Sequence, residues 1–412
     1  MTIRALFALV LALLAPLAAR RDGTGVIALL TWLSLSTSAQ AANLAPGAYV
    51  SAGHTVYIGV RHDPPEPPSN DFFDPTSQRT GDLQPTPDLR LQCALQEEPH
   101  VIEAPQGKLG FSLYRAGDAP RAAVILVHGN DPETREMGFI VPFFVCNGVN
   151  VISYDQRGVG ASSGDWLLNG PSQRAGDVEA IYDAMQGDRH VAPRRVGIWG
   201  FSNGGWTAPL VSVHRPLAFM ILKSAPTQSL LQNIDYEVEQ SLRRHEAQQA
   251  SAQALSLWHA FERSLEGTVP WSDTRRLYDA DAKQPWFQYS LMPDLGISIP
   301  PPPAKIAGLR RFITYDPTQT LLSVTTPTLA LYGALDRNVD AADSAAHLRE
   351  YLGRAADRDV TIRMYPDAGH QLIVSRSGYN GDPLPPERFV ADYPQIMLSW
   401  LAQRGFTGQR LR

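Results

Sequence analysis

A serine flanked by glycines directly follows an apolar run. Residues 200–204 read Gly-Phe-Ser-Asn-Gly, a G-x-S-x-G pattern centred on Ser202. A serine raised on a tight strand-to-helix turn becomes an exposed nucleophile, and its neighbours are glycines because the chain passes closely there. The turn also places the Asn203 N–H at a helix N-terminus, where developing negative charge is favoured. The alternative is a plain glycine-rich turn, but the position between a β-branched run and a helical segment favours the nucleophile.

A second apolar run, Val124–Val127, ends in His128-Gly129-Asn130. The loop after such a strand is where a further donor to an oxyanion is expected, and we assign this role to the backbone N–H of Asn130, alongside that of Asn203. His128 itself is expected to be structural and to hold the loop in place.

An acid and a base follow the last two apolar runs. Asp336 comes just after residues 329–333, and His370 lies on the loop after residues 360–365. A carboxylate at the end of a buried strand can reach a histidine on the next loop and fix its tautomer. Asp340, Asp343 and Asp367 compete for the acid role, and we assign it to Asp336. The chain order Ser202, Asp336, His370 separates this set from the two other common serine-triad orders.

Alternating strands and helices must position these residues. Seven short apolar runs are expected to be strands: Leu109–Tyr114, Ala122–Val127, Val149–Tyr154, Val196–Trp199, Leu217–Leu222, Thr328–Tyr332 and Val360–Tyr365. Helical patterns lie between them, for example at Pro142–Asn147 and Ser172–Met185. This alternation predicts an α/β fold with a mostly parallel sheet covered by helices on both faces. The two earliest strands have no helix between them and are expected to pair antiparallel.

About a hundred residues separate the strand near Lys223 from the strand near Thr328, far more than a usual connection of about 4–6 residues. Apolar residues from Val238 to Leu265 recur at spacings of three and four, which predicts one long amphipathic helix. We therefore expect a helical cap over the site. Its aromatic residues can line an apolar acyl or aryl pocket or form the core of the cap; they are Trp258, Phe261, Trp271, Trp286, Phe287 and Tyr289.

The first 41 residues are typical of an export signal. A charged flank, an apolar run of about 10 residues and the small residues Ala39 and Ala41 match a cleavable signal peptide, with an uncleaved membrane anchor as the alternative. Residues 42–92 are rich in Pro, and we expect them to form an extension packed on the main domain. Only Ala48–Val60 suggests a strand or a hairpin; the segments 64–68 and 71–75 are excluded as strands because of their prolines.

Taken together, these residues resemble the α/β-hydrolase family over roughly residues 95–405. The segment Tyr154–Ser162 resembles the family's D-x-R-G-x-G-x-S turn after the fourth strand. Within the family the chain looks most like exported dienelactone-hydrolase-like and prolyl-oligopeptidase-like enzymes. It departs from the prolyl oligopeptidases in having no room for a β-propeller ahead of the catalytic domain. It departs from the proline-iminopeptidase type in having Asn203, not Trp, after the serine. The resemblance implies an eight-stranded, mostly parallel sheet with the cap inserted between strands 6 and 7. We expect the chain to divide into a signal peptide (1–41), a Pro-rich extension (42–92), the first part of the core (93–226), the helical cap (227–322) and the second part of the core (323–412).

The composition and the charge of the chain limit which partners it is expected to bind. The net charge is −5 and the pI is about 6.1, so there is no basic field for nucleic acid. We expect a small acyl substrate, no metal, no organic cofactor and no stable membrane insertion after signal cleavage. Cys93 and Cys146 are equally compatible with a disulfide and with free thiols. The sequence predicts an exported serine esterase or thioesterase; a serine peptidase and a non-catalytic envelope binding protein are the alternatives, and the oligomeric state stays open.

Overall fold

The computed structural model describes residues 44–51, 53–62, 69–82, 88–353, 359–380 and 382–407. The expected signal segment, residues 1–41, and the Pro-rich run 64–68 lie outside the described residues.

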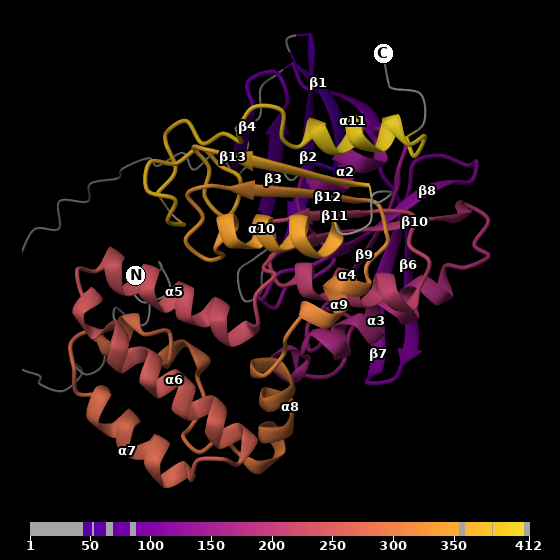
Figure 1. The fold of residues 1–412 in the computed structure, drawn as a ribbon. Helices are drawn as coiled ribbons and strands as arrows, with labels where there is room; N and C mark the ends of the chain where they lie inside the picture. The colour runs from indigo at the N-terminus through magenta and orange to yellow at the C-terminus, as the bar shows by residue number, and fades with distance from the viewer. Residues whose placement is uncertain are drawn as a thin grey trace, which may run out of the picture. The chain divides into compact units, whose positions relative to one another are not determined.

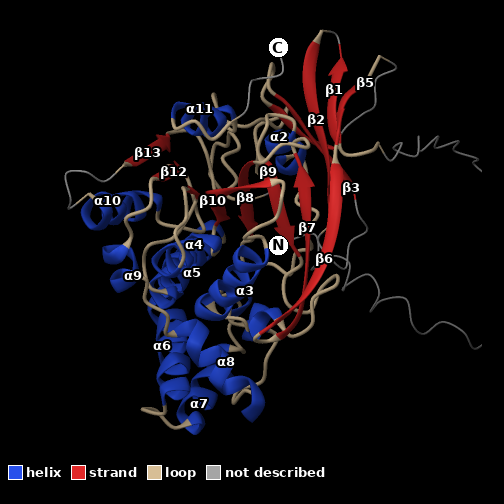
Figure 2. Ribbon diagram, turned by 90° about the vertical axis from the view of Figure 1, so that its right-hand side faces the viewer, coloured by secondary structure: helices blue, strands red, loops and turns tan. Residues whose placement is uncertain are grey.

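An eight-stranded sheet forms the centre of the fold (Figure 2). Its strands, in chain order, are β6 (Gln96–Ala104), β7 (Gly107–Arg115), β8 (Arg121–Val127), β9 (Asn150–Tyr154), β10 (Val191–Phe201), β11 (Met220–Lys223), β12 (Thr328–Gly333) and β13 (Val360–Tyr365). The spatial order is β13-β12-β11-β10-β8-β9-β7-β6. The six strands from β8 to β13 are parallel, and β7 pairs antiparallel with both β6 and β9. The expected α/β-hydrolase sheet is therefore confirmed.

All seven apolar runs form strands of this sheet, but the expected pairing of the two earliest runs is wrong. β7 and β8 are not neighbours, because β9 lies between them. The antiparallel partner of β7 is the edge strand β6, which the sequence analysis missed. β6 carries Glu97, Glu98 and Pro99, and most of its residues are exposed or half-buried. An edge strand with so little apolar surface does not show the pattern of a buried strand.

Helices cover both faces of the sheet, because its strands are apolar on both sides. In β8, Val124 and Leu126 join one core cluster, whereas Ala123 and Ile125 join the other. The first cluster includes α2 (Ile140–Val145) and α11 (Gln395–Gln403); the second includes α3 (Pro171–Ala184), α4 (Gly204–His214), α9 (Thr318–Ser323) and α10 (Ala341–Leu352). Figure 1 shows α2 and α11 on one side of the strands, with α3, α4 and α10 on the other. Among the described residues, no helix combines the length and the apolar character needed to cross a bilayer.

The chain between β11 and β12 folds as the expected helical insertion (Figure 1). Its helices are α5 (Leu230–Arg244), α6 (Ser251–Glu266), α7 (Trp271–Asp281) and α8 (Pro303–Ile313), with the 3₁₀ turns η2 (Gln248–Ala250), η3 (Phe287–Tyr289) and η4 (Pro293–Leu295). The predicted single long helix is wrong, because α5 ends at Arg244 and α6 begins at Ser251. Glu246, between them, has a φ of 55°, which no α-helix can accommodate.

A separate five-stranded antiparallel sheet precedes the main sheet in the chain. Its strands are β1 (Gly47–Ser51), β2 (His54–Arg61), β3 (Ser69–Asp74), β4 (Arg79–Asp82) and β5 (Arg90–Ala94), in the order β4-β3-β2-β1-β5. The β1–β2 hairpin confirms the expectation for Ala48–Val60. The exclusion of residues 71–74 is wrong: β3 pairs with β2 and β4, and Pro75 stands just after the strand, where it removes no ladder donor.

The small sheet packs on α2. Tyr57 and Phe73 contact the Phe143 ring, with centroids 5.3 and 6.1 Å away. Cys93 in β5 and Cys146, just after α2, form a disulfide, with Cα atoms 6.0 Å apart. The structure thus decides the question that the sequence left open.

Candidate active site

Ser202 stands on the turn between β10 and α4. Its φ of 51° is left-handed, a conformation that costs about 1–3 kcal/mol for a residue with a side chain. The turn closes through two hydrogen bonds: the Ser202 N–H donates to the Lys223 carbonyl at 3.0 Å, and the Gly205 N–H donates to the Ser202 carbonyl at 2.7 Å. A Cβ at position 205 would overlap the Ala225 Cβ, so glycine is required there for close packing. The local chain therefore has the strained turn that the sequence predicted.

His370 and Asp336 lie in direct contact. His370 Nδ1 is 2.8 Å from Asp336 Oδ2, and both side chains are buried. Asp336 Oδ1 accepts hydrogen bonds from the backbone N–H groups of Asn338 at 2.8 Å and Val339 at 3.0 Å. A carboxylate fixed in this way orients the ring so that Nδ1 carries the proton and Nε2 is left as a base.

The competing acids have other contacts. Asp340 caps α10 by accepting from the Asp343 N–H at 3.0 Å, and Asp343 accepts from Gln228 Nε2 at 2.7 Å. Asp367 is exposed. The structure therefore brings Asp336, the residue that the sequence favoured, to His370.

The loop after β8 passes beside Ser202. A Cβ at Gly129 would lie 3.5 Å from the Ser202 Cβ, which is ordinary contact distance. The Gly129 carbonyl is held by Arg174 Nη1 at 2.9 Å and Gln156 Nε2 at 3.3 Å. Asn130 and Asn203 line one cavity together with Ser202 and His370, so the two expected oxyanion donors belong to residues of the same site.

His128 anchors this loop. Its Nε2 is 2.6 Å from the Tyr154 carbonyl, and its Nδ1 is 3.0 Å from Glu133 Oε2. Both ring nitrogens therefore face oxygen atoms, one from the backbone of β9 and one from Glu133, and these two contacts hold the ring in place. Glu133 has a lowered pKa: burial opposes the charged form, but the His128 hydrogen bond and charge outweigh it.

The turn after β9 supports the same loop. Asp155 pairs with Arg135, whose Nη2 lies 2.6 Å from Asp155 Oδ2, and accepts from the Ala161 N–H at 2.7 Å. Arg157 is buried, pairs with Asp177 of α3 and donates to the Lys108 carbonyl at 2.9 Å. The resemblance at Tyr154–Ser162 thus corresponds to an Arg–backbone network.

The cavity over Ser202 has a volume of about 390 Å³. Most of its apolar wall comes from the cap, namely Leu230, Ile234, Trp258, Leu291, Leu295, Phe312 and Ile313. Trp166 and Leu167, from the segment between β9 and α3, complete it. Of the six cap aromatics singled out in the sequence, only Trp258 lines the cavity. The other five belong to the core cluster of the cap or pack against it. The interpretation as cap core was therefore right for most of them.

The charged lining of this cavity is acidic. Asp131, Glu133, Glu237 and Asp294 line it, and no Lys or Arg is among its lining residues in the described chain. Burial, aided by the charges of Asp336 and Asp131, raises the pKa of Glu237 to about 7, although Asn338 Nδ2 donates to Glu237 Oε1 at 2.7 Å. Sequence reasoning missed Glu237, since it is one of several polar residues of an amphipathic helix.

Helix α5 also holds the loops that carry Asp336 and His370. The Tyr236 hydroxyl donates to the Asp336 carbonyl at 2.7 Å, next to the Glu237–Asn338 bond. One turn further along, the Tyr379 hydroxyl donates to the Gln240 carbonyl at 3.0 Å. The first helix of the cap is therefore fixed to the acid loop.

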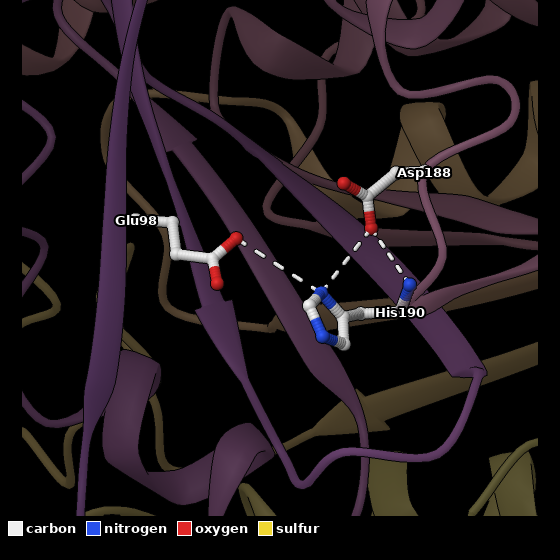
Figure 3. Close-up of side chains that lie close together, drawn as sticks. All are labelled: Glu98, Asp188 and His190. Carbon is white, nitrogen blue, oxygen red and sulfur yellow. Dashed lines mark hydrogen bonds and ion pairs between the residues drawn. The ribbon is translucent and has the colours of Figure 1, made fainter.

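A separate cluster of Glu98, Asp188 and His190 offers the only grouping of three possible metal ligands found in the described chain (Figure 3). His190 Nδ1 lies 3.5 Å from Asp188 Oδ1 and 3.9 Å from Glu98 Oε2. Arg115 Nη1 lies 3.1 Å from His190 Nε2, so this nitrogen accepts and Nδ1 carries the proton, which leaves it no lone pair for a metal. Arg115 Nε also pairs with Glu98 Oε1 at 2.9 Å. The cluster is therefore explained by the Arg115–Glu98 ion pair and by the hydrogen bond from Arg115 to the His190 ring.

Comparisons with known proteins agree with this arrangement. Residues 118–376, more than half of the chain, match the family described as serine aminopeptidase, S33. No curated protein matches the chain.

Three solved structures illustrate the similarity. The esterase Pf2001 of Pyrococcus furiosus is 16% identical over 76% of this chain and 89% of that chain, with a TM-score of 0.46. The acylaminoacyl peptidase of Pyrococcus horikoshii is 10% identical over 86% of this chain and 48% of that chain, with a TM-score of 0.49. A protein assigned as a dienelactone hydrolase from Klebsiella pneumoniae is 16% identical over 75% of this chain and 99% of that chain, with a TM-score of 0.45.

Proposed function

The chain belongs to the S33 serine aminopeptidase family of α/β-hydrolase serine hydrolases, and we propose that it is an exported enzyme that cleaves a carboxylic ester or thioester. One observation carries the proposal: the buried Asp336–His370 pair lies in the same cavity as Ser202 on its strained turn.

In this proposal Ser202 attacks the acyl carbonyl while His370 Nε2 removes its proton. His370 then returns the proton to the departing alcohol or thiol, which leaves an acyl-enzyme for water to hydrolyse. Asp336 holds the imidazole and stabilises its cation. The N–H groups of Asn130 and Asn203 stabilise the tetrahedral oxyanion, each by about 3 kcal/mol in comparable sites.

Two features support export. The first 41 residues have the composition of a cleavable signal peptide. The Cys93–Cys146 disulfide is of the kind that persists in oxidising compartments.

A peptidase is the second candidate, because the acidic lining of the cavity favours a substrate with a free amine. Asp131, Glu133, Glu237 and Asp294 border the space above Ser202, and none of the described lining residues is a Lys or Arg. The ester proposal instead draws on the apolar wall formed by the cap.

The test compares the purified chain with Ser202→Ala and with Ser272→Ala, an exposed serine of α7. Substrates are p-nitrophenyl esters of increasing chain length, an acyl thioester and aminoacyl p-nitroanilides. We expect ester or thioester turnover that Ser202→Ala abolishes and Ser272→Ala retains. Turnover of anilides alone would instead identify a peptidase. A folded protein that hydrolyses nothing and does not react with a fluorophosphonate would overturn both candidates in favour of a binding protein.

A further inference from the structure

A second cavity, of about 290 Å³, borders the catalytic one. The two share the wall residues Glu133, Phe201 and Gln371, but Ser202 and His370 do not line the second cavity. Its other walls come from the small sheet, from the start of α2 and from the chain before α11. The volume is near the lower end of the roughly 300–1,000 Å³ found for small-molecule sites.

Two buried donors that the proposed mechanism does not use line this cavity. Lys223 is 6% exposed, and within the described chain its Nζ has one hydrogen-bonded oxygen, Gln371 Oε1 at 3.1 Å. The ammonium also faces aromatic rings, with the centroids of Phe201 and Tyr393 at 4.5 and 5.5 Å. Trp199 is 4% exposed, and its Nε1 has no hydrogen-bond partner among the described residues. A buried donor without an acceptor is costly, so Trp199 Nε1 favours a ligand that brings an oxygen atom. The Lys223 ammonium can donate three hydrogen bonds and has one such partner here, so it favours the same kind of ligand.

The donors come from adjacent strands on the same face of the main sheet. Lys223 of β11 is in register with Phe201 of β10, and Trp199 stands two residues before Phe201. Side chains two apart point to the same face, and ligands of α/β sheets bind beyond the carboxyl ends of the strands.

Nearby carboxylates already have partners. Glu133 contacts His128 at 3.0 Å, Glu136 contacts His62 at 3.1 Å, and Asp71 Oδ2 accepts from the Phe139 N–H at 3.3 Å. Each of these three acids therefore has a partner other than the Lys223 ammonium. Most of the apolar wall is aromatic, from Phe139, Trp199, Phe201, Phe389 and Tyr393, and Met137, Ile140 and Ile373 complete it.

We propose that this cavity is a second binding site for a small aryl or alkyl carboxylic acid, whose carboxylate pairs with the Lys223 ammonium and whose apolar part contacts the aromatic wall. Trp199 supplies a further donor in the same cavity. Because Gln371 follows His370 directly, a carboxylate that displaces Gln371 Oε1 from Lys223 acts on the loop that carries the base.

The charge of Lys223 makes this binding pH-dependent. Burial and the charge of Arg61 lower its pKa to about 7, while Asp71, Glu133 and Asp336 act in the opposite direction. The other titratable groups lining the cavity are Glu136, Glu387 and Tyr393. A carboxylate binds the protonated amine, so its affinity falls as pH rises through 7, by roughly tenfold between pH 6 and pH 8.

The test is calorimetric titration of the full chain with sodium benzoate, and with benzamide as the uncharged match. We expect benzoate to bind the wild type and Ser202→Ala equally, and benzamide to bind at least tenfold more weakly. Lys223→Met should weaken benzoate binding at least tenfold, and Trp199→Phe about threefold. Lys283→Met, which changes an exposed lysine of the cap, should leave binding unchanged.

Two results would overturn the proposal: no heat of binding at 10 mM benzoate, or equal affinity in the wild type and Lys223→Met. A thermal melt of each variant shows that it is folded. If Lys223→Met does not fold, three other results test the site: weaker benzoate binding by Trp199→Phe, weaker binding of benzamide than of benzoate, and lower benzoate affinity at pH 8 than at pH 6. The absence of all three effects rejects the site.

Discussion

At the residue scale, the turn around Ser202 depends on how closely α4 approaches the chain after β11. Gly205 packs against Ala225 with no space for a methyl group. A Cβ added at Gly176 in α3, by contrast, would have no other atom of the described chain within 4 Å outside its own helical turn. Substitution of these two glycines by alanine therefore compares a crowded position with an open one.

We predict that Gly205→Ala lowers the free energy of unfolding by about 1–3 kcal/mol, because the added methyl group overlaps Ala225 and the chain must shift. Gly176→Ala should leave stability unchanged or raise it by up to about 1 kcal/mol, because alanine favours a helix interior. Urea unfolding of both variants checks this, and equal effects would contradict the packing argument.

A second prediction concerns the Asp336–His370 contact. Asp336→Asn should lower kcat by about 10³–10⁴-fold, because an amide no longer holds the imidazole with its proton on Nδ1. KM and the melting temperature should change little. Asp367→Asn, at an exposed acid three residues before His370, is the control. Retained activity in Asp336→Asn with loss in Asp367→Asn would reverse the assignment.

At the element scale, helix α5 links the cap to the acid loop through a partly buried carboxyl group. The pKa of Glu237 is raised from its ordinary value of 4.5 to about 7, mainly by burial. The folded state therefore binds this proton more tightly than the unfolded state does. The stabilisation that this bound proton gives the folded state is lost as pH rises from about 4.5 to 7, the window between the pKa of Glu237 in the unfolded state and its pKa in the folded state.

We expect Glu237→Gln to be more stable than the wild type at pH 8 and to lose that advantage at pH 5, because glutamine does not titrate. Urea midpoints at both pH values measure the difference. Glu266→Gln, at an exposed position that ends α6, should show no such trend. If the difference in urea midpoint between Glu237→Gln and the wild type is the same at pH 5 and pH 8, the folded state does not disfavour the charged form of Glu237.

Sequence reasoning located the elements whose apolar residues are contiguous and missed those whose burial depends on distant partners. The strands of the parallel sheet are apolar on both faces, so each run could be recognised alone. β3 and β6 could not, because Asp71, Glu97 and Glu98 belong to strands that are partly exposed. The break between α5 and α6 was hidden, because the apolar spacing continues across it with only one longer gap. Ser202, Asp336 and His370 could be named because each follows a recognisable strand, and Lys223 could be placed near the site because it ends one. Glu237 could not, because it acquires its environment only from the folded cap and the loop that carries Asp336.

At the scale of the whole molecule, a disulfide cross-links the small sheet to the main core. The Cys93–Cys146 disulfide closes a sequence separation of 53 residues. Such a bond stabilises the fold mainly by restricting the unfolded chain.

The double variant Cys93→Ser/Cys146→Ser should lose about 2–5 kcal/mol of stability. Dithiothreitol should lower the urea midpoint of the wild type towards that of the variant and leave the variant unchanged. An equal midpoint for the oxidised wild type and the double variant would show that non-covalent contacts, such as those of Tyr57 and Phe73 with Phe143, are sufficient to fix the small sheet on α2.

The bonds from α5 to Asp336 and Asn338 also limit how this enzyme can be re-engineered. A chimaera that exchanges residues 227–322 for the insertion of another hydrolase would replace the substrate-facing wall and, with it, the Tyr236 hydroxyl and the Glu237 carboxyl. The recipient loop would then lose two of the contacts that hold its acid in place. A successful graft must therefore transplant residues 336–338 together with the insertion, so that specificity and catalytic competence are inherited as one unit.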